Sequence, residues 1–234
     1  MLSVRDLRVS FGHAEILQGV SLDVGDEPFA VAGRNGMGKT TLCYAIMGMV
    51  PVQSGGVVFD GASIEGKSPT RVSRSGIAIV PQGRRVFPSL TVDEHLRLVS
   101  RGKNAAWSIE RVYDTFPRLA ERKGNGGSQL SGGEQQMLAI SRALLLNPKL
   151  IIMDEPSEGL APVLVDHLIE VLKKLANEKI GLLLVEQNLR VATSVASNVA
   201  IMLSGRIAAT VPASQLSADE ALQRRYLGVS TGSH

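Results

Sequence analysis

Residues 33–41 read GRNGMGKTT and follow a short apolar run, FAVA, at residues 29–32. The stretch fits the pattern G-x-x-x-x-G-K-[ST], whose fixed positions are Gly33, Gly38, Lys39 and Thr40. Glycines let the backbone turn its N–H groups toward a polyphosphate, where a Cβ would clash. We expect a helix to begin at about Lys39, so that its free N–H groups and positive dipole end also face the phosphates. The stretch therefore predicts a phosphate-binding loop between a buried strand and a helix.

The whole loop is a candidate nucleotide site. Lys39 would bring a positive charge to the terminal phosphates, and the Thr40 hydroxyl is suited to bind Mg²⁺. The candidate nucleotide-binding residues are Gly33, Arg34, Asn35, Gly36, Met37, Gly38, Lys39, Thr40 and Thr41. The alternative is a glycine-rich turn that matches the pattern by chance, and the strand before it and the helix after it argue against that alternative.

Two adjacent acids follow a second apolar run, LIIM, at residues 150–153. Asp154 and Glu155 would lie at the carboxyl end of a buried strand, which is where ligands bind in open α/β sheets. Asp154 fits a Mg²⁺ ligand and Glu155 a general base that activates water. The alternative is a solvated turn, which the phosphate loop in the same chain disfavours.

A second glycine-rich stretch, LSGGEQQ, occupies residues 130–136. Its candidate ligand-binding residues are Ser131, Gly132, Gly133 and Glu134. Free N–H groups at a helix N-terminus, a capping hydroxyl and the absence of bulky side chains favour an anion site. The alternative is an ordinary helix cap. Two phosphate-binding helix ends in one chain would make sense if two subunits hold one nucleotide.

The composition indicates a globular α/β protein rather than a nucleic-acid-binding or membrane-spanning one. Among 234 residues, 44% are hydrophobic and 20% charged, and the formal net charge is only +3. The basic pair Arg84–Arg85 is interpreted as a solvated loop. Cys43 is the single cysteine, which fits a reducing compartment, and we expect it to be buried. Since no run of 18 apolar residues occurs, we expect a cytoplasmic protein.

Strands that alternate with helices predict an α/β fold with a largely parallel sheet. Alternating apolar residues in the first 25 positions predict an antiparallel β-layer. Residues 77–80, IAIV, predict a strand that is covered on both faces. The turn Ser204–Gly205 predicts a hairpin between two further strands.

The segment 83–130 differs in character and predicts a small helical insertion. Thr91 and Glu94 have the spacing of a capping box, residues 108–116 predict a second helix, and residues 124–127 predict a flexible link. We therefore expect one domain over residues 1–234, with a nucleotide-binding core at 1–82 and 131–228 and a helical subdomain at 83–130.

These motifs together resemble those of an ABC transporter ATPase. GRNGMGKTT, Gln82, LSGGEQQ, LIIMDEP and SEGLAP resemble the Walker A, Q-loop, signature, Walker B and D-loop sequences, and LSGGEQ is a highly specific signature. FPSLTVDEHL, FPRLAERK, VEQN and RRYLGV further resemble the LivF-type subunit of branched-chain amino-acid importers. The resemblance implies a P-loop NTPase (RecA-like) core with an antiparallel β-layer and an inserted helical subdomain.

The resemblance also implies roles for individual residues. A head-to-tail dimer would place Ser131 and Gly133 of one subunit against the nucleotide on Lys39 of the other. Phe11 matches the aromatic position that stacks on adenine, although a core aromatic at a strand end is an alternative. Gln82 resembles the residue that senses Mg²⁺ and water and links the helical insertion to the catalytic core.

The sequence departs from the family pattern at Gln187, where the switch histidine usually stands. Glutamine can donate a hydrogen bond to a γ-phosphate but carries no titrating charge. The substitution is common in LivF-like chains. It leaves open whether this subunit hydrolyses ATP as fast as its partner.

The expected function is Mg²⁺-dependent ATP hydrolysis in an importer at the cytoplasmic face of the inner membrane. The expected partners are polytopic permease subunits, a LivG-like second ATPase or a second copy of this chain, and indirectly an extracytoplasmic solute-binding protein, with no nucleic acid. Branched-chain amino acids, amides and urea-like solutes all remain possible. The alternatives are a non-transport ABC ATPase and, with no reason for LSGGEQQ, a small-molecule P-loop kinase.

Overall fold

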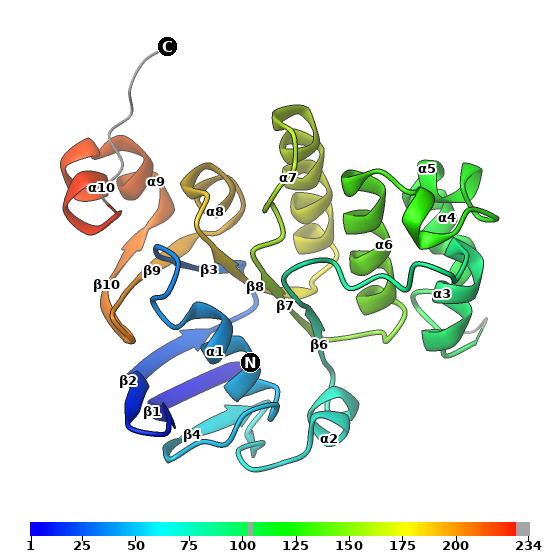
Figure 1. Cartoon of the computed structure of the whole chain (residues 1–234). Coiled ribbons are helices and arrows are strands. Elements are labelled where there is room, and N and C mark those ends of the chain that lie inside the picture. Colours follow the sequence, from blue (N-terminus) through cyan, green and yellow to red (C-terminus); the bar gives the residue numbers. More distant parts are fainter. Residues whose placement is uncertain (103–104, 228–234) are drawn as a thin grey trace.

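The computed structural model describes residues 1–102 and 105–227, with side chains up to residue 224 (Figure 1). The end of the RRYLGV motif, residues 228–229, and residue 228 of the predicted core lie outside the described residues. Within the described part of the chain, no helix is both long enough and apolar enough to cross a membrane.

A six-stranded sheet forms the centre of the molecule, in the order β10-β9-β3-β8-β7-β6. Its strands are β3 (Phe29–Ala32), β6 (Ile77–Val80), β7 (Leu150–Asp154), β8 (Gly181–Glu186), β9 (Asn198–Leu203) and β10 (Arg206–Pro212). All neighbouring pairs are parallel except β9 and β10, which form the predicted antiparallel hairpin. The predicted α/β class with a largely parallel sheet is confirmed.

A smaller antiparallel sheet, in the order β2-β1-β4-β5, confirms the predicted β-layer. It comprises β1 (Leu2–Phe11), β2 (Ala14–Val24), β4 (Ser54–Phe59) and β5 (Ala62–Ser63). The register of β1 against β2 shifts at several points, as expected of strands that bend to cover a second layer. Figure 1 shows this sheet below the central one, with the amino terminus at its edge.

Successive residues of the central strands face two different cores, because side chains alternate along a strand. Ala30, Ile151 and Leu184 pack against the helices on one face, whereas Val31 and Ile152 pack toward α1 and the antiparallel sheet. The helices are α1 (Lys39–Ile46), α2 (Pro69–Arg74), α3 (Val92–Val99), α4 (Ile109–Thr115), α5 (Pro117–Glu121), α6 (Gly132–Leu144), α7 (Pro162–Asn177), α8 (Leu189–Val195), α9 (Ala213–Ala218) and α10 (Glu220–Leu227). Cys43 is buried among the apolar residues of the second core, as predicted.

Helices α3 to α5 and a short 3₁₀ helix, η1 (Gly127–Gln129), occupy the predicted helical insertion. Figure 1 shows them beside α6, away from the antiparallel sheet. The division of the chain at residues 82/83 and 130/131 stays a prediction. The expected flexible link at 124–127 is wrong for the described structure: the N–H of Gly127 donates to the carbonyl of Leu90, and a Cβ on Gly127 would lie 2.5 Å from the carbonyl oxygen of Phe87.

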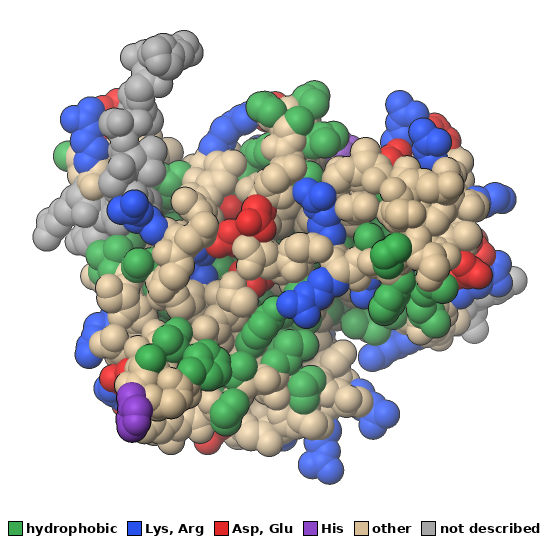
Figure 2. Space-filling view, viewed as in Figure 1, with side chains coloured by type: hydrophobic (Ala, Val, Ile, Leu, Met, Phe, Trp, Pro, Cys, Tyr) green, Lys and Arg blue, Asp and Glu red, His purple; other side chains and the backbone are tan. Residues whose placement is uncertain are grey.

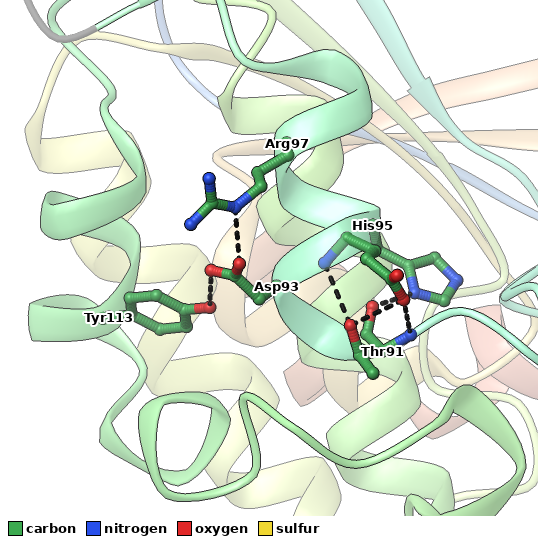
Figure 3. A network of polar contacts seen from close by, with 6 residues as sticks. Thr91, Asp93, His95, Arg97 and Tyr113 are labelled. Atoms are coloured by element: carbon green, nitrogen blue, oxygen red, sulfur yellow. Dashed lines mark hydrogen bonds and ion pairs between the residues drawn. The ribbon is translucent and has the colours of Figure 1, made fainter.

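A polar network fixes the start of α3 (Figure 3). The Thr91 hydroxyl accepts from the N–H of Glu94, and the Glu94 carboxylate accepts from the N–H of Thr91, which confirms the predicted capping box. Asp93 bridges Arg97 on its own helix and the Tyr113 hydroxyl on α4. His95, which is 1% exposed, accepts at Nε2 from the N–H of Phe87 at 2.8 Å. The helical insertion is thereby joined to the segment that follows Gln82.

Candidate functional site

The phosphate loop connects the fully buried strand β3 to α1, which begins at Lys39 as predicted. Gly38, at the N-cap of α1, has φ +98°, a left-handed conformation that favours glycine. At Gly33 a Cβ would lie 2.7 Å from the carbonyl oxygen of Met202, so glycine is needed there for close packing on β9. Backbone shape and packing therefore both require glycines in this loop.

The β9–β10 hairpin fixes the loop from outside. The Met37 carbonyl accepts from the N–H of Gly205 at 3.0 Å, and the Met37 sulfur accepts from the N–H of Ser204 at 3.2 Å. The Lys39 ammonium donates to the carbonyl of Arg34 at 3.0 Å. These contacts hold the loop in a defined shape and use the carbonyl of Arg34 and the carbonyl and sulfur of Met37.

Lys39 and Glu155 form a buried ion pair. Lys39 Nζ lies 2.9 Å from Glu155 Oε1, and the two side chains are only 3% and 7% exposed. Glu155 has φ +48°, which is strained for a residue with a Cβ. The conformation is held in part by β8, because the Glu155 N–H donates to the carbonyl of Val185 at 2.8 Å.

Asp154 ends β7 beside this pair and is 1% exposed. Neither carboxylate oxygen has a hydrogen-bond partner in the described structure. Burial raises the pKa of Asp154 to about 6. The nearby Thr40 hydroxyl partly opposes that shift. An unpartnered buried carboxylate next to a hydroxyl fits an oxygen site for a divalent cation. The residues present therefore fit Mg²⁺.

A cavity of about 350 Å³ opens beside the loop. Its lining includes Phe11, Asn35, Lys39, Thr40, Gln82 and Glu155, with Gly36, Gly38 and Thr41 beside them. Phe11 is 49% exposed, which argues against the alternative of a core aromatic and leaves its ring accessible at the cavity. The structure thus brings together most of the predicted nucleotide-binding residues around one space.

Gln82 and Gln187 line two different cavities, and Glu155 lines both of them. The Gln82 amide donates to the Glu158 carboxylate at 3.0 Å. Gln187 lines a second cavity of about 260 Å³, which also includes Asn35, Glu155 and Glu158. Because Asn35 and Glu155 line both cavities, the two spaces adjoin. Figure 2 shows acidic side chains gathered near the centre of this face, with basic side chains around them.

The stretch LSGGEQQ begins α6 and builds a complete cap. The Ser131 hydroxyl accepts from the N–H of Glu134 at 3.3 Å, and Glu134 accepts from the N–H of Ser131 at 2.8 Å. A Cβ on Gly133 would lie 2.9 Å from Leu164, and one on Gly132 would meet the Arg84 guanidinium at the same distance. Capping and packing therefore favour these residues at the start of α6 whether or not a ligand binds there.

The predicted second anion site is not part of the phosphate-loop cavity. Ser131, Gly133 and Glu134 line a different cavity, of about 480 Å³, which shares no residue with the cavity at Lys39. One subunit therefore does not bring its own Ser131 to its own Lys39. A nucleotide that contacts both would have to lie between two subunits.

Sequence reasoning missed several polar residues around the site. Arg84 and Arg85 lie in a loop, as predicted, and they also make contacts there: the Arg84 guanidinium donates to the carbonyl of Glu158 at 3.1 Å, and Arg85 donates to the Tyr44 hydroxyl at 2.8 Å. Glu158 stands inside the SEGLAP stretch, and Glu186 follows the apolar run of β8. Glu186 could have been identified from the sequence as an acidic residue at the end of an apolar strand.

The sequence matches one family model and several relatives along their full length. The family model described as ABC transporter matches residues 17–158. The chain is 36% identical over 232 residues to the high-affinity branched-chain amino acid transport ATP-binding protein BraG of Pseudomonas aeruginosa, with 97% of this chain and 100% of BraG covered. It is 33% identical to the probable branched-chain amino acid transport ATP-binding protein LivF of Archaeoglobus fulgidus, covering 98% and 99%. The lipopolysaccharide export system ATP-binding protein LptB of Haemophilus influenzae is 32% identical, with 97% of each chain covered.

The solved structures that resemble this fold are ATP-binding cassettes. A nucleotide-free cassette from an ABC transporter has a TM-score of 0.85 and 25% identity, with 98% of this chain and 99% of that one covered. The ADP conformation of the cassette MJ1267 has a TM-score of 0.81 and 26% identity over the same shares. The dimeric cassette MJ0796, at a TM-score of 0.78 and 23% identity over 91% and 99%, shows a likeness of fold alone.

Proposed function

The chain belongs to the ABC transporter family, and from that premise we propose that it is the ATPase subunit of an importer for branched-chain amino acids or related small polar solutes. As a member of that family it binds ATP and hydrolyses it in a transporter complex. The observation that carries the solute class is the 36% identity to BraG along the whole chain. LptB, named for export, is only slightly less similar, so the direction of transport has to be tested.

Hydrolysis requires the buried pair of Lys39 and Glu155 to separate. The polyphosphate of ATP replaces Glu155 as the partner of the Lys39 charge. Glu155 is then free to orient the attacking water, and Gln187, across the adjoining cavity, donates a hydrogen bond to the γ-phosphate. Phe11 stacks on the adenine at the exposed end of the cavity. Catalysis in this scheme is positioning and charge stabilisation by preformed groups.

Thr40, Asp154 and Gln82 are the residues that would hold Mg²⁺, which when bound neutralises charge on the phosphate oxygens. Asp154 supports this assignment because both of its oxygens are buried and have no hydrogen-bond partner among the described residues. Gln82 lines the cavity but donates its amide to Glu158, so it would exchange that hydrogen bond on contact with Mg²⁺. The exchange would link the nucleotide site to the segment that enters the helical insertion.

The dimer is head to tail in this proposal. The separation of the two cavities supports it, because Ser131 and Gly133 can reach a nucleotide on Lys39 only from another subunit. The second subunit is a LivG-like ATPase or another copy of this chain. The dimer binds polytopic permease subunits at the cytoplasmic face of the inner membrane, and a solute-binding protein acts on the other side. The alternative is an ABC ATPase that acts in assembly or regulation.

Phosphate release from Mg-ATP tests the enzymatic part of the proposal. Lys39→Ala should abolish detectable turnover while the fold is retained, because the variant loses charge compensation at the transferring group. Lys173→Ala, on the exposed face of α7, is the matched control and should keep the parent rate. Near-normal turnover by folded Lys39→Ala would contradict the site.

Uptake in cells tests the solute and the direction of transport. A strain without this chain should take up leucine, isoleucine or valine more slowly, the parent chain should restore uptake, and Glu155→Gln should not. Unchanged uptake of these amino acids, together with loss of an exported compound, would support an exporter instead. Retained ATPase activity with no transport phenotype and no co-purifying permease would support the assembly or regulation role.

A further inference from the structure

Glu186 is a buried carboxylate that joins two loops of the candidate site. It ends β8 and is 1% exposed. Its Oε1 accepts from the N–H of Ser157 at 3.0 Å, and its Oε2 accepts from the N–H of Asn188 at 3.2 Å. Ser157 lies two residues after Glu155, and Asn188 directly follows Gln187. One side chain therefore contacts the backbone next to both residues that the proposed reaction uses.

Burial of the Glu186 carboxylate at the end of β8 costs free energy. The preceding residues of β8, 182–185, are apolar and fully buried, so packing alone would be satisfied by another apolar residue. Burial raises the pKa of Glu186 to about 6, although the hydrogen bonds from Ser157 and Asn188 oppose that shift. A carboxylate that is costly to bury and that accepts hydrogen bonds from two loops is suited to holding those loops in place.

Glu155 needs such support. Its φ of +48° is sparsely populated by non-glycine residues, and such a conformation persists only when the surroundings hold it. Its own N–H is bound to the carbonyl of Val185, and Ser157, two residues later, is bound to Glu186. Both restraints come from neighbouring residues of β8, so the end of this strand sets the path of the chain around Glu155.

The turn at Gln187 is held in the same way. Asn188 donates its N–H to Glu186, and its side chain accepts from the N–H of Arg190 to cap α8. Arg190 in turn pairs with Asp166 on α7. Gln187 thus lies between a restrained strand end and a restrained helix start, on the cavity that it shares with Glu155.

We propose that Glu186 is a positioning residue for ATP hydrolysis, which fixes Glu155 and Gln187 relative to each other through the N–H groups of Ser157 and Asn188. The inference rests on the proposed function, in which Glu155 orients water and Gln187 contacts the γ-phosphate. Glu186 is only 1% exposed, and in this proposal it acts through the two loops rather than on the nucleotide. Its loss should therefore change the rate of the bound complex and leave nucleotide affinity in place.

The test uses Glu186→Gln, which keeps the size of the side chain but turns one acceptor into an N–H₂ donor that faces a backbone N–H. We expect kcat to fall by about 10-fold to 100-fold, the scale of a small misplacement of catalytic groups. The KM for ATP, the affinity for ADP and the thermal midpoint should stay close to those of the parent. Glu170→Gln, on an exposed face of α7, is the matched control and should leave kcat unchanged.

A double-mutant cycle with Gln187→Ala separates positioning from general damage. If Glu186 acts through Gln187, the effect of Glu186→Gln on kcat should be much smaller in the Gln187→Ala background than in the parent. If Glu186→Gln cannot be obtained folded, Glu186→Asp serves, because a chain shorter by one methylene cannot reach both N–H groups. An unchanged kcat would overturn the proposal, as would fully multiplicative effects or an equal loss of ATP affinity and thermal midpoint. If the parent hydrolyses ATP and Lys39→Ala does not, the proposed function stands even though the proposal for Glu186 fails.

Discussion

Lys39 Nζ lies 2.9 Å from Glu155 Oε1, and this contact pairs the phosphate-loop cation with the proposed base. Two opposite charges buried together neutralise each other at a desolvation cost, and removal of one leaves the other unpaired. The nucleotide therefore competes with Glu155 for Lys39.

This competition predicts tighter nucleotide binding by Glu155→Gln. With the carboxylate gone, Lys39 is an unpaired buried cation, so ADP should bind about 10-fold more tightly, equivalent to about 1.4 kcal/mol. Isothermal titration calorimetry with ADP avoids turnover in the parent, and Glu170→Gln is the control. ADP affinity equal to that of the parent or weaker would contradict the competition.

Asp154→Asn should stabilise the nucleotide-free protein and remove its response to Mg²⁺. The parent carboxylate is buried with no hydrogen-bond partner in the described structure, and replacing it by a neutral group of the same shape relieves an unpaired charge. We expect a rise of about 2–6 °C in the unfolding midpoint in EDTA, from a change of roughly 1–2 kcal/mol. The exposed Asp114→Asn is the control. A lower midpoint, or an unchanged effect of Mg²⁺ on nucleotide-bound protein, would contradict the assignment of Asp154.

Gln187→Ala should slow hydrolysis by about 10²-fold or more, which is the scale of losing one preorganised donor. Gln187→His should remain active and gain pH dependence between pH 5 and 8, because imidazole titrates in that range. Steady-state phosphate release from pH 5.5 to 8.5 measures both effects. Parent-like activity of the alanine variant would show that Gln187 does not contact the γ-phosphate.

His95 should make stability depend on pH. Burial lowers the pKa of His95 and Arg142 lowers it further, while the Thr91 carbonyl and Glu94 oppose the shift. Since the folded pKa lies below the unfolded value of 6.5, the unfolded chain binds more protons between the two, and stability is lost as pH falls below about 6.5.

The comparison of parent and His95→Asn isolates this effect from that of other groups. The free energy of unfolding of the parent, relative to the variant, should fall between pH 7.5 and 5.5, as measured by urea titration. His13→Asn, at an exposed histidine, should show no such difference from the parent. A pH-independent difference between parent and His95→Asn would mean that the Phe87–His95 hydrogen bond does not restrict protonation.

The sequence predicted those helices and strands that are determined by residues close together in the chain. The strands β6 and β7 are continuous apolar runs, the cap at Thr91 needs only Glu94 three residues on, and α1 begins where the phosphate loop ends. Helices α8, α9 and α10 have no strong sequence signal of their own because they are short; α8 and α9 are stabilised by packing on the sheet, and α10 packs against α9.

The parts that sequence reasoning missed depend on contacts between distant segments. Arg84 lies in the predicted loop, but its hydrogen bond to the carbonyl of Glu158, 74 residues later, exists only because the fold brings the two segments together. Glu186 reads as the polar end of a strand until the loop at Ser157, 29 residues earlier, donates to it. The predicted link at 124–127 is ordered because Gly127 packs against the backbone of Phe87. None of these partners is visible from residue spacing.

The central claim is that one nucleotide is held by Lys39 of one subunit and Ser131 of another. Light scattering of Glu155→Gln with Mg-ATP tests it most directly, because blocked hydrolysis should hold the two subunits closed. The molar mass should double on addition of Mg-ATP, for this chain alone or with a LivG-like subunit, and Ser131→Arg added to the same chain should weaken or prevent the doubling. Tight ATP binding with no dimer in either mixture would contradict the claim.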